Sequence, residues 1–272
     1  MKTRILTAVI ALPLALAAVF YLPMEGFAVL CMAMLGVGAW EWGGFLRVSV
    51  AARVFYLALC FSGFIFLWCL LETPQVLDAT LLIAAIWWLM ASVWVVIYPR
   101  GFGDGAPDRL MVAVTGLLVL LPTFVAMVTL QAREPNGPLQ LLVVLAMIWA
   151  ADSGAYFAGR FLGRHKLAPK VSPGKTWEGA VGGFVAGMLV VLGGGLWVYE
   201  LQATVLQQYL VLGALVVALS IVGDLTESMF KRATNIKDSG SLFPGHGGIM
   251  DRIDSLTAAA PCYLLGLHYL AI

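Results

Sequence analysis

Nine long apolar segments dominate this 272-residue chain and restrict the folds that are open to it. A bilayer has a hydrocarbon core about 30 Å thick, which a helix of roughly 20 apolar residues can cross. The segments are continuous and do not alternate between apolar and polar residues, which favours helices over a membrane β-barrel. They comprise residues 5–22, 26–46, 54–72, 77–98, 110–130, 139–159, 177–199, 206–230 and 253–271. The sequence therefore predicts one all-α, polytopic integral-membrane domain over residues 1–272, with about nine transmembrane helices.

Composition agrees with this class. Hydrophobic residues make up 61% of the chain and charged residues 11%, whereas soluble domains usually carry roughly a quarter charged residues. The first segment has an alternative interpretation, because Lys2 and Arg4 before an apolar run also resemble a signal peptide with a cleavage site at residues 15–17. Since the apolar run continues to Leu22 and eight further segments follow, we favour a retained first helix.

The basic residues predict the orientation of the chain. With nine helices, fifteen of the sixteen Lys and Arg residues fall on the side of the N-terminus, and Arg133 falls on the other. The positive-inside rule makes the crowded side cytoplasmic. We therefore expect a cytoplasmic N-terminus, a C-terminus outside in the periplasm, and cytoplasmic loops at 160–176 and 231–252. The predicted location is the inner (plasma) membrane, crossed several times.

The two halves of the chain differ in polarity. Residues 1–140 form N-terminal helices with few charges, of which Glu41 is the main exception; we interpret it as a carboxylate hydrogen-bonded within the helix bundle. Residues 141–272 carry the polar residues and are expected to hold the active site. In this half Gly179, Gly183 and Gly187 recur at intervals of four, which predicts close approach by another helix. That helix could belong to the same chain or to a second protomer, so a homodimer through this face stays open.

Carboxylates gather at both ends of the stretch 224–254. Asp224, Glu227 and Ser228 share one helical face, and Asp251 and Asp254 are three residues apart where the last helix begins. Converging carboxylates repel one another unless a cation compensates them. Mg²⁺ typically uses one or two carboxylates together with substrate phosphates. We therefore predict a Mg²⁺ site with Asp224, Glu227, Asp251 and Asp254 as candidate ligands, and leave a second cation open.

A second polar segment, residues 166–178, suits an anion. It contains Gly174-Lys175-Thr176, but Pro169 stands where a phosphate-binding P-loop requires glycine, so that motif is excluded. Thr176 is a candidate helix N-cap. Free amides at a helix N-terminus beside a lysine are well suited to phosphate. A third polar group, Asp152 with Ser153 and Tyr156, interrupts the sixth apolar segment.

Each charge taken alone could belong to a salt-bridged boundary loop, in which Asp238 pairs with Lys237 or Arg232. The full set, together with a second phosphate-competent segment on the same side, favours a phosphate–metal site. His246, flanked by glycines, could act as a base, as a hydrogen-bond donor to phosphate or as a structural donor. The four cysteines lack the spacing of a zinc site or a disulfide framework.

The polar stretch also carries a long motif. It reads Ser228-Met-Phe-Lys231-Arg232, four residues, Lys237-Asp238, then Gly240, Phe243-Pro244, His246-Gly247-Gly248 and Asp251-Arg252-Ile-Asp254. This motif resembles the signature of phosphatidate cytidylyltransferases (CDP-diacylglycerol synthases). Residues 172–179 and Asp152-Ser153 resemble other polar segments of that family. The resemblance covers roughly residues 150–256, whereas residues 1–140 resemble the family only as a run of membrane helices.

The resemblance implies that CTP and phosphatidate react to give CDP-diacylglycerol and pyrophosphate. A lipid phosphate is already ionised at neutral pH, so catalysis can rest on positioning and charge neutralisation. We expect Asp224, Asp251 and Lys175 to be catalytic. Substrate contacts are expected from Ser172, Lys175, Lys231, Arg232, Lys237, Asp238, His246 and Arg252. The expected partners are CTP, phosphatidate and membrane lipids, and no nucleic acid.

Two rival functions remain at this point. A secondary transporter or ion channel would also use intramembrane carboxylates such as Asp152 and Asp224. Clustering of the polar residues at one predicted boundary argues against it, because transport needs access from both sides. A CDP-alcohol phosphotransferase would need a DGxxAR-type run, and the sequence contains none.

Overall fold

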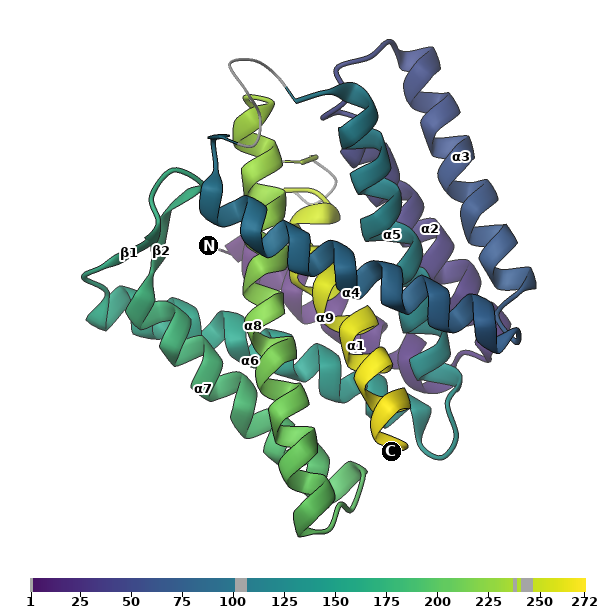
Figure 1. Cartoon of the computed structure of the whole chain (residues 1–272), viewed down its shortest axis with the longest axis vertical. Coiled ribbons are helices and arrows are strands. Elements are labelled where there is room, and N and C mark those ends of the chain that lie inside the picture. Colours follow the sequence, from purple (N-terminus) through teal and green to yellow (C-terminus); the bar gives the residue numbers. More distant parts are fainter. Residues whose placement is uncertain (1, 101–106, 237–238, 241–246) are drawn as a thin grey trace.

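The computed structural model describes residues 2–100, 107–236, 239–240 and 247–272, with side chains from residue 12 onward. This part of the chain is almost entirely helical (Figure 1). Its nine α-helices are α1 (Lys2–Tyr21), α2 (Met24–Trp42), α3 (Val50–Cys69), α4 (Pro74–Ile97), α5 (Arg109–Ala132), α6 (Gly137–Leu162), α7 (Trp177–Gly193), α8 (Ala203–Ala233) and α9 (Met250–Leu270). A single π-helical turn, η2 (Gly194–Val198), follows α7.

Each predicted apolar segment coincides with one of these helices. Seven of them, α2 to α8, are long and apolar enough to cross a membrane within the described part of the chain, the seventh-helix span including η2. Helix α1 contributes a shorter described apolar portion, Leu12–Tyr21, and α9 is a helix of 21 residues that opens with charged side chains. The all-α, polytopic architecture is confirmed, while the orientation of the termini stays a prediction.

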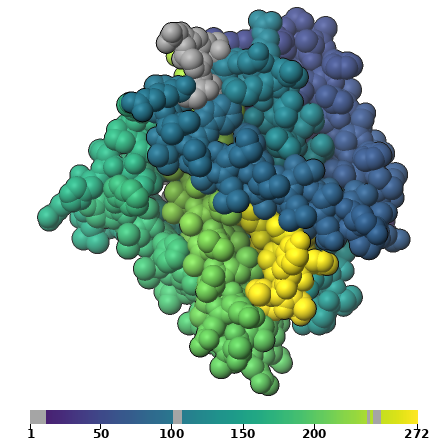
Figure 2. Space-filling model, in the orientation of Figure 1, coloured from purple at the N-terminus to yellow at the C-terminus, as the bar shows by residue number. Residues whose placement is uncertain are grey.

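Helix α5 lies at the centre of the N-terminal helices. It contacts α2, α3, α4, α6 and α9, and its apolar side chains are largely buried. The indole of Trp42 on α2 donates a hydrogen bond to the carbonyl of Val112 at 2.8 Å. Its ring also lies 5.2 Å from that of Phe230 on α8. Helix α4 crosses over α8 and α9, as the blue segment in the foreground of Figure 2 shows. These contacts tie the N-terminal helices to the polar half.

The glycine face of α7 packs against its own chain. A Cβ atom at Gly183 would lie 2.6 Å from the carbonyl oxygen of Ala151 on α6, and one at Gly179 would lie 3.0 Å from that of Ala155. Gly187 faces Val217 of α8. The predicted close approach is therefore confirmed, and its partners are α6 and α8. The structure thus shows the partner within the same chain, and the homodimer stays an untested prediction.

A short β-hairpin replaces most of the loop predicted at residues 160–176. Strands β1 (Lys166–Ala168) and β2 (Ser172–Thr176) pair antiparallel, with Lys166 opposite Thr176. The hairpin projects from the side of the molecule (Figures 1 and 2). Val171 at its turn is buried, and its carbonyl accepts a hydrogen bond from Arg232 Nε of α8 at 3.3 Å. The hairpin is thereby fixed beside α8, at the start of α7.

Candidate active site

Helices α8 and α9 form the wall that carries most of the predicted site residues. Gly223 allows them to approach closely, since a Cβ atom there would lie 2.5 Å from the carbonyl oxygen of Asp254. This contact brings the acidic face of α8 against the first turns of α9. Asp254 interacts electrostatically with both Asp224 and Glu227. The two carboxylate groups that the sequence places at opposite ends of one stretch therefore meet in the structure.

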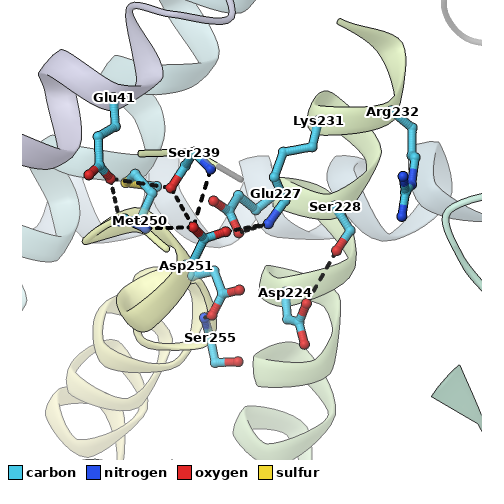
Figure 3. Close-up of polar contacts among 12 residues, drawn as sticks. Glu41, Asp224, Glu227, Ser228, Lys231, Arg232, Ser239, Met250, Asp251 and Ser255 are labelled. Carbon is cyan, nitrogen blue, oxygen red and sulfur yellow. Dashed lines mark hydrogen bonds and ion pairs between the residues drawn. The ribbon is translucent and has the colours of Figure 1, made fainter. Parts of the chain in front are cut away.

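Lys231 links the two helices at this wall. Its ammonium group lies 2.9 Å from Glu227 Oε2 on α8 and 2.6 Å from Asp251 Oδ1 on α9 (Figure 3). All three side chains are largely enclosed, with exposed fractions of 14% for Lys231, 2% for Glu227 and 12% for Asp251. Lys231 was predicted to contact substrate phosphate. In the structure it compensates two carboxylates.

Asp251 is held by several contacts with the described residues. Besides the Lys231 contact, its Oδ2 atom accepts hydrogen bonds from the amide of Gly248 at 2.8 Å, and from the amide and hydroxyl of Ser239 at 3.2 and 2.8 Å. Gly247 has a φ of 79°, which only glycine adopts readily. A Cβ atom at that position would also lie 2.5 Å from Asp251 Oδ2. The turn before α9 is thus shaped around this side chain.

The hairpin supplies the opposite side of the site. Thr176 accepts a hydrogen bond from the amide of Gly179 at 3.1 Å, which confirms it as the N-cap of α7. The preceding residue, Lys175, forms an ion pair with Asp224 of α8. Asp224 lies also within 3.4 Å of the hydroxyl of Ser228. Two polar segments about fifty residues apart in the sequence are thereby joined by one contact.

A cavity of about 390 Å³ adjoins the Lys175–Asp224 pair. It lies between α6, α7, α8 and the hairpin, and Asp152, Ser220 and Ser255 add polar atoms to its wall. Half of the remaining lining residues are small residues on α6 and α7, such as Gly159 and Gly179. The cavity is therefore mainly apolar, with charged groups from α6, the hairpin and α8.

Other predicted residues lie at different places. Ser172 pairs with Ala168 in the hairpin and does not line the cavity. Arg232 points away from the Lys231 cluster (Figure 3) and bonds the hairpin turn instead. Arg252 is exposed and interacts electrostatically with Asp152. Lys237, Asp238 and His246 lie outside the described residues.

The structure adds residues to which the sequence assigned no role in the site. Asp152 was singled out without a role, and it lines the cavity. Arg160 and Tyr156 also line it, and Arg160 Nη1 donates a hydrogen bond to the Tyr156 hydroxyl at 2.6 Å. Ser239 holds Asp251, as described above. Ser239 could not be predicted, because a single serine in a polar turn belongs to no periodic pattern. Glu41 was predicted to be hydrogen-bonded within the bundle; this is confirmed by its bonds to the amides of Ile249 and Met250.

The carboxylates of the wall offer oxygen ligands of the kind that Mg²⁺ prefers. Among the described residues, no three His, Cys, Asp or Glu side chains are placed to hold a metal ion by themselves. Glu227 Oε1 is buried and receives no hydrogen bond from an amide, amine or hydroxyl group of these residues, and the carboxyl group of Asp254 lies beside it. Carboxylate oxygens that outnumber the nearby hydrogen-bond donors suit Mg²⁺. The ion takes its remaining ligands from water and phosphate. Glu227 and Asp254 fit such an ion as they stand, and Asp224 fits it once Lys175 leaves its carboxylate, whereas the oxygens of Asp251 are held by Lys231, Ser239 and Gly248.

Comparison with known proteins identifies the family of this chain. The model of the cytidylyltransferase family matches residues 2–270. A phosphatidate cytidylyltransferase of Pseudomonas aeruginosa is 45% identical, with 97% of this chain and 95% of the relative covered. The Haemophilus influenzae protein of the same name is 36% identical, with 97% of both chains covered. A Bacillus subtilis protein of that name is 36% identical over about half of each chain. The chain therefore belongs to the cytidylyltransferase family.

Proposed function

We propose that this protein transfers the cytidylyl group of CTP to phosphatidate, giving CDP-diacylglycerol and pyrophosphate. In this reaction a phosphate oxygen of the lipid bonds to the α-phosphorus of CTP. The bond from that phosphorus to the oxygen bridging to the β-phosphate breaks, and pyrophosphate leaves. The names of the relatives support the substrates. The observation that carries the proposal is the Lys175–Asp224 pair, which joins the hairpin to the carboxylate wall at the cavity.

The cavity suits a reaction between a lipid and a soluble nucleotide. Its apolar walls come from helices long enough to cross a membrane, and its charged groups come from α6, the hairpin and α8. An amphiphile can place its phosphate at the charged side while its acyl chains stay beside the apolar helices. A water-soluble nucleotide would then approach from the side of the hairpin. Family membership also decides against the transporter alternative.

Lys175 is the cation best placed to contact phosphate. Its ammonium group lines the cavity, whereas the ammonium of Lys231 is enclosed between Glu227 and Asp251. We propose that Lys175 leaves Asp224 and binds a substrate phosphate when the charge of Asp224 is compensated in another way. A flexible lysine is suited to this exchange, because it acts as a mobile point charge. Lys231 would keep Asp251 in place and contribute positive potential.

We propose Mg²⁺ as the cofactor, held by Asp224, Glu227 and Asp254 together with substrate phosphates. The ion would neutralise the triphosphate and stabilise the pyrophosphate leaving group. The residues of the chain then orient the two phosphates and exclude alternative acceptors such as water. The cation excess on the N-terminal side supports a site that faces the cytoplasm from the inner membrane.

The function is tested with purified protein in mixed micelles of detergent and phosphatidate. Each of the four nucleoside triphosphates is added in turn with Mg²⁺, and pyrophosphate release is followed. We expect release with CTP only, and only when phosphatidate is present. Equal release with all four nucleotides, or release without lipid, would contradict the proposal.

The orientation has its own test, in cells that carry a cysteine-free version of the protein. We expect a cysteine at Lys166 to react with a membrane-impermeant maleimide only after the inner membrane is made permeable. A cysteine at Asn136, in the exposed turn between α5 and α6, should react once the reagent reaches the periplasm. The reverse pattern would place the site outside.

A further inference from the structure

Glu41 on α2 is a buried acid that lies outside the proposed catalytic set. Its exposed fraction is 4%, and its charge interacts with that of Arg53 on α3. A buried charge requires hydrogen bonds in place of water. Glu41 Oε1 accepts one from the amide of Ile249 at 3.0 Å, and Oε2 accepts one from the amide of Met250 at 2.9 Å (Figure 3). Both donors lie more than two hundred residues further along the chain.

These two amides belong to the start of α9, which has no cap of its own. The N-cap residue is Ile249, whose side chain can accept no hydrogen bond. The first amides of a helix lack partners within the helix and carry partial positive charge. Glu41 therefore caps α9 from another helix, because it accepts hydrogen bonds from the amides of the N-cap residue and of the first helical residue.

The surrounding turn is shaped to receive the Glu41 carboxylate. A Cβ atom added at Gly240 would overlap Glu41 Oε1, and one added at Gly248 would overlap Oε2. Glycine at these two positions lets the backbone close around both oxygens. Two independent features, the bonded amides and the glycine contacts, thus place the same carboxylate.

A short chain of contacts leads from Glu41 into the active site. The hydroxyl of Ser239 lies 3.3 Å from Glu41 Oε2 and 2.8 Å from Asp251 Oδ2. Asp251 in turn contacts Lys231, which contacts Glu227. The helix start that Glu41 holds is also the one that carries Asp251. Glu41 thus acts on Asp251 both through Ser239 and through the first turn of α9.

We propose that Glu41 is a positioning residue, through which the N-terminal helices hold Ser239 and the start of α9 so that Asp251 stays aligned with Lys231. It touches no substrate in this account. The kinetic part of the test rests on the proposed function, whereas the structural part does not. A misplacement of about 1 Å at a reacting centre can lower a rate by about a hundredfold.

The first experiment compares Glu41→Gln with Glu25→Gln, an exposed acid in the first turn of the same helix. Hydrogen exchange is followed by mass spectrometry in peptides covering residues 247–253 and, as reference, 115–128 of α5. We expect faster exchange in 247–253 for Glu41→Gln alone, with α5 unchanged. Unaltered exchange in 247–253 would overturn the capping claim, whatever reaction the protein catalyses.

The second experiment is a double-mutant cycle of Glu41→Gln and Ser239→Ala on kcat and KM, with the amount of folded protein determined for each variant. We expect each single variant to lower kcat by about tenfold to a hundredfold, and the double variant to be no worse than the poorer single one. A purely structural role would lower thermal stability and leave kcat per folded molecule unchanged, which would refute the proposal. Strictly additive effects would refute the link through Ser239. If Glu41→Gln fails to fold, Glu41→Asp replaces it in the cycle, because Ser239→Ala alone also removes the direct bond from Ser239 to Asp251. If neither the wild type nor Glu25→Gln transfers the cytidylyl group, the proposed function is refuted, and not the role of Glu41.

Discussion

Removal of the Lys231 ammonium should destabilise the protein far more than removal of an exposed lysine. In Lys231→Met the stem of the side chain is kept, but Glu227 and Asp251 lose their shared cation. Since both carboxylates are largely buried, water cannot replace the lost ammonium group as a partner for their charges. Breaking such a pair from one side typically costs about 3–5 kcal/mol. At about 2–4 °C per kcal/mol for a chain of this size, Tm should fall by roughly 6–20 °C.

The assay is thermal unfolding in detergent, with Lys166→Met as the matched control. Lys166 is exposed on β1 and forms no ion pair among the described residues, so the free energy of unfolding should change by less than about 0.5 kcal/mol. A double variant, Lys231→Met with Glu227→Gln, should recover part of the loss, because one of the two buried charges is removed as well. Equal Tm values for the two lysine variants would refute the reasoning.

Two further predictions concern helix packing and the metal site. Gly183→Leu should lower the free energy of unfolding by about 1–3 kcal/mol, since its Cβ would press on the Ala151 carbonyl; Val185→Leu on the exposed face is the control, and a changed oligomeric state at unchanged Tm would contradict the packing. Asp254→Asn should raise the Mg²⁺ concentration for half-maximal activity by about tenfold or more, whereas Asp78→Asn should not, because Asp78 is a half-buried acid paired with His268. Equal Mg²⁺ titrations would remove Asp254 from the metal site.

The helices could be predicted because membrane solvation leaves a continuous apolar run few alternatives. The helices that pack against the glycine face of α7 could not be predicted. The spacing of Gly179, Gly183 and Gly187 reports a surface that another backbone can approach, but it carries no information about which backbone does so. The hairpin was missed for a related reason. Its strands are three and five residues long and contain Pro173 and Gly174, a composition typical of loops.

In the site, the sequence predicted what lies close along the chain. Asp224 with Glu227, and Asp251 with Asp254, follow from helical periodicity. The role of Lys231 did not follow, because only the approach of α8 and α9 at Gly223 brings Asp251 to its ammonium group. Glu41 was recognised as hydrogen-bonded, but its partners lie some two hundred residues away. Contacts of that range depend on the packing of helices, which single-sequence periodicity does not report.

The most direct test of the central claim follows the label from CTP carrying a radioactive α-phosphate into lipid, for the wild type and for Asp224→Asn. Asp224 pairs with Lys175 and lines the cavity, so its carboxylate is where the hairpin, the carboxylate wall and the substrates should meet. We predict that the wild type transfers label to phosphatidate with one pyrophosphate released per lipid labelled. Asp224→Asn should fold with a similar Tm and transfer essentially none. Transfer by Asp224→Asn at the wild-type rate would contradict the assignment of this cavity as the active site.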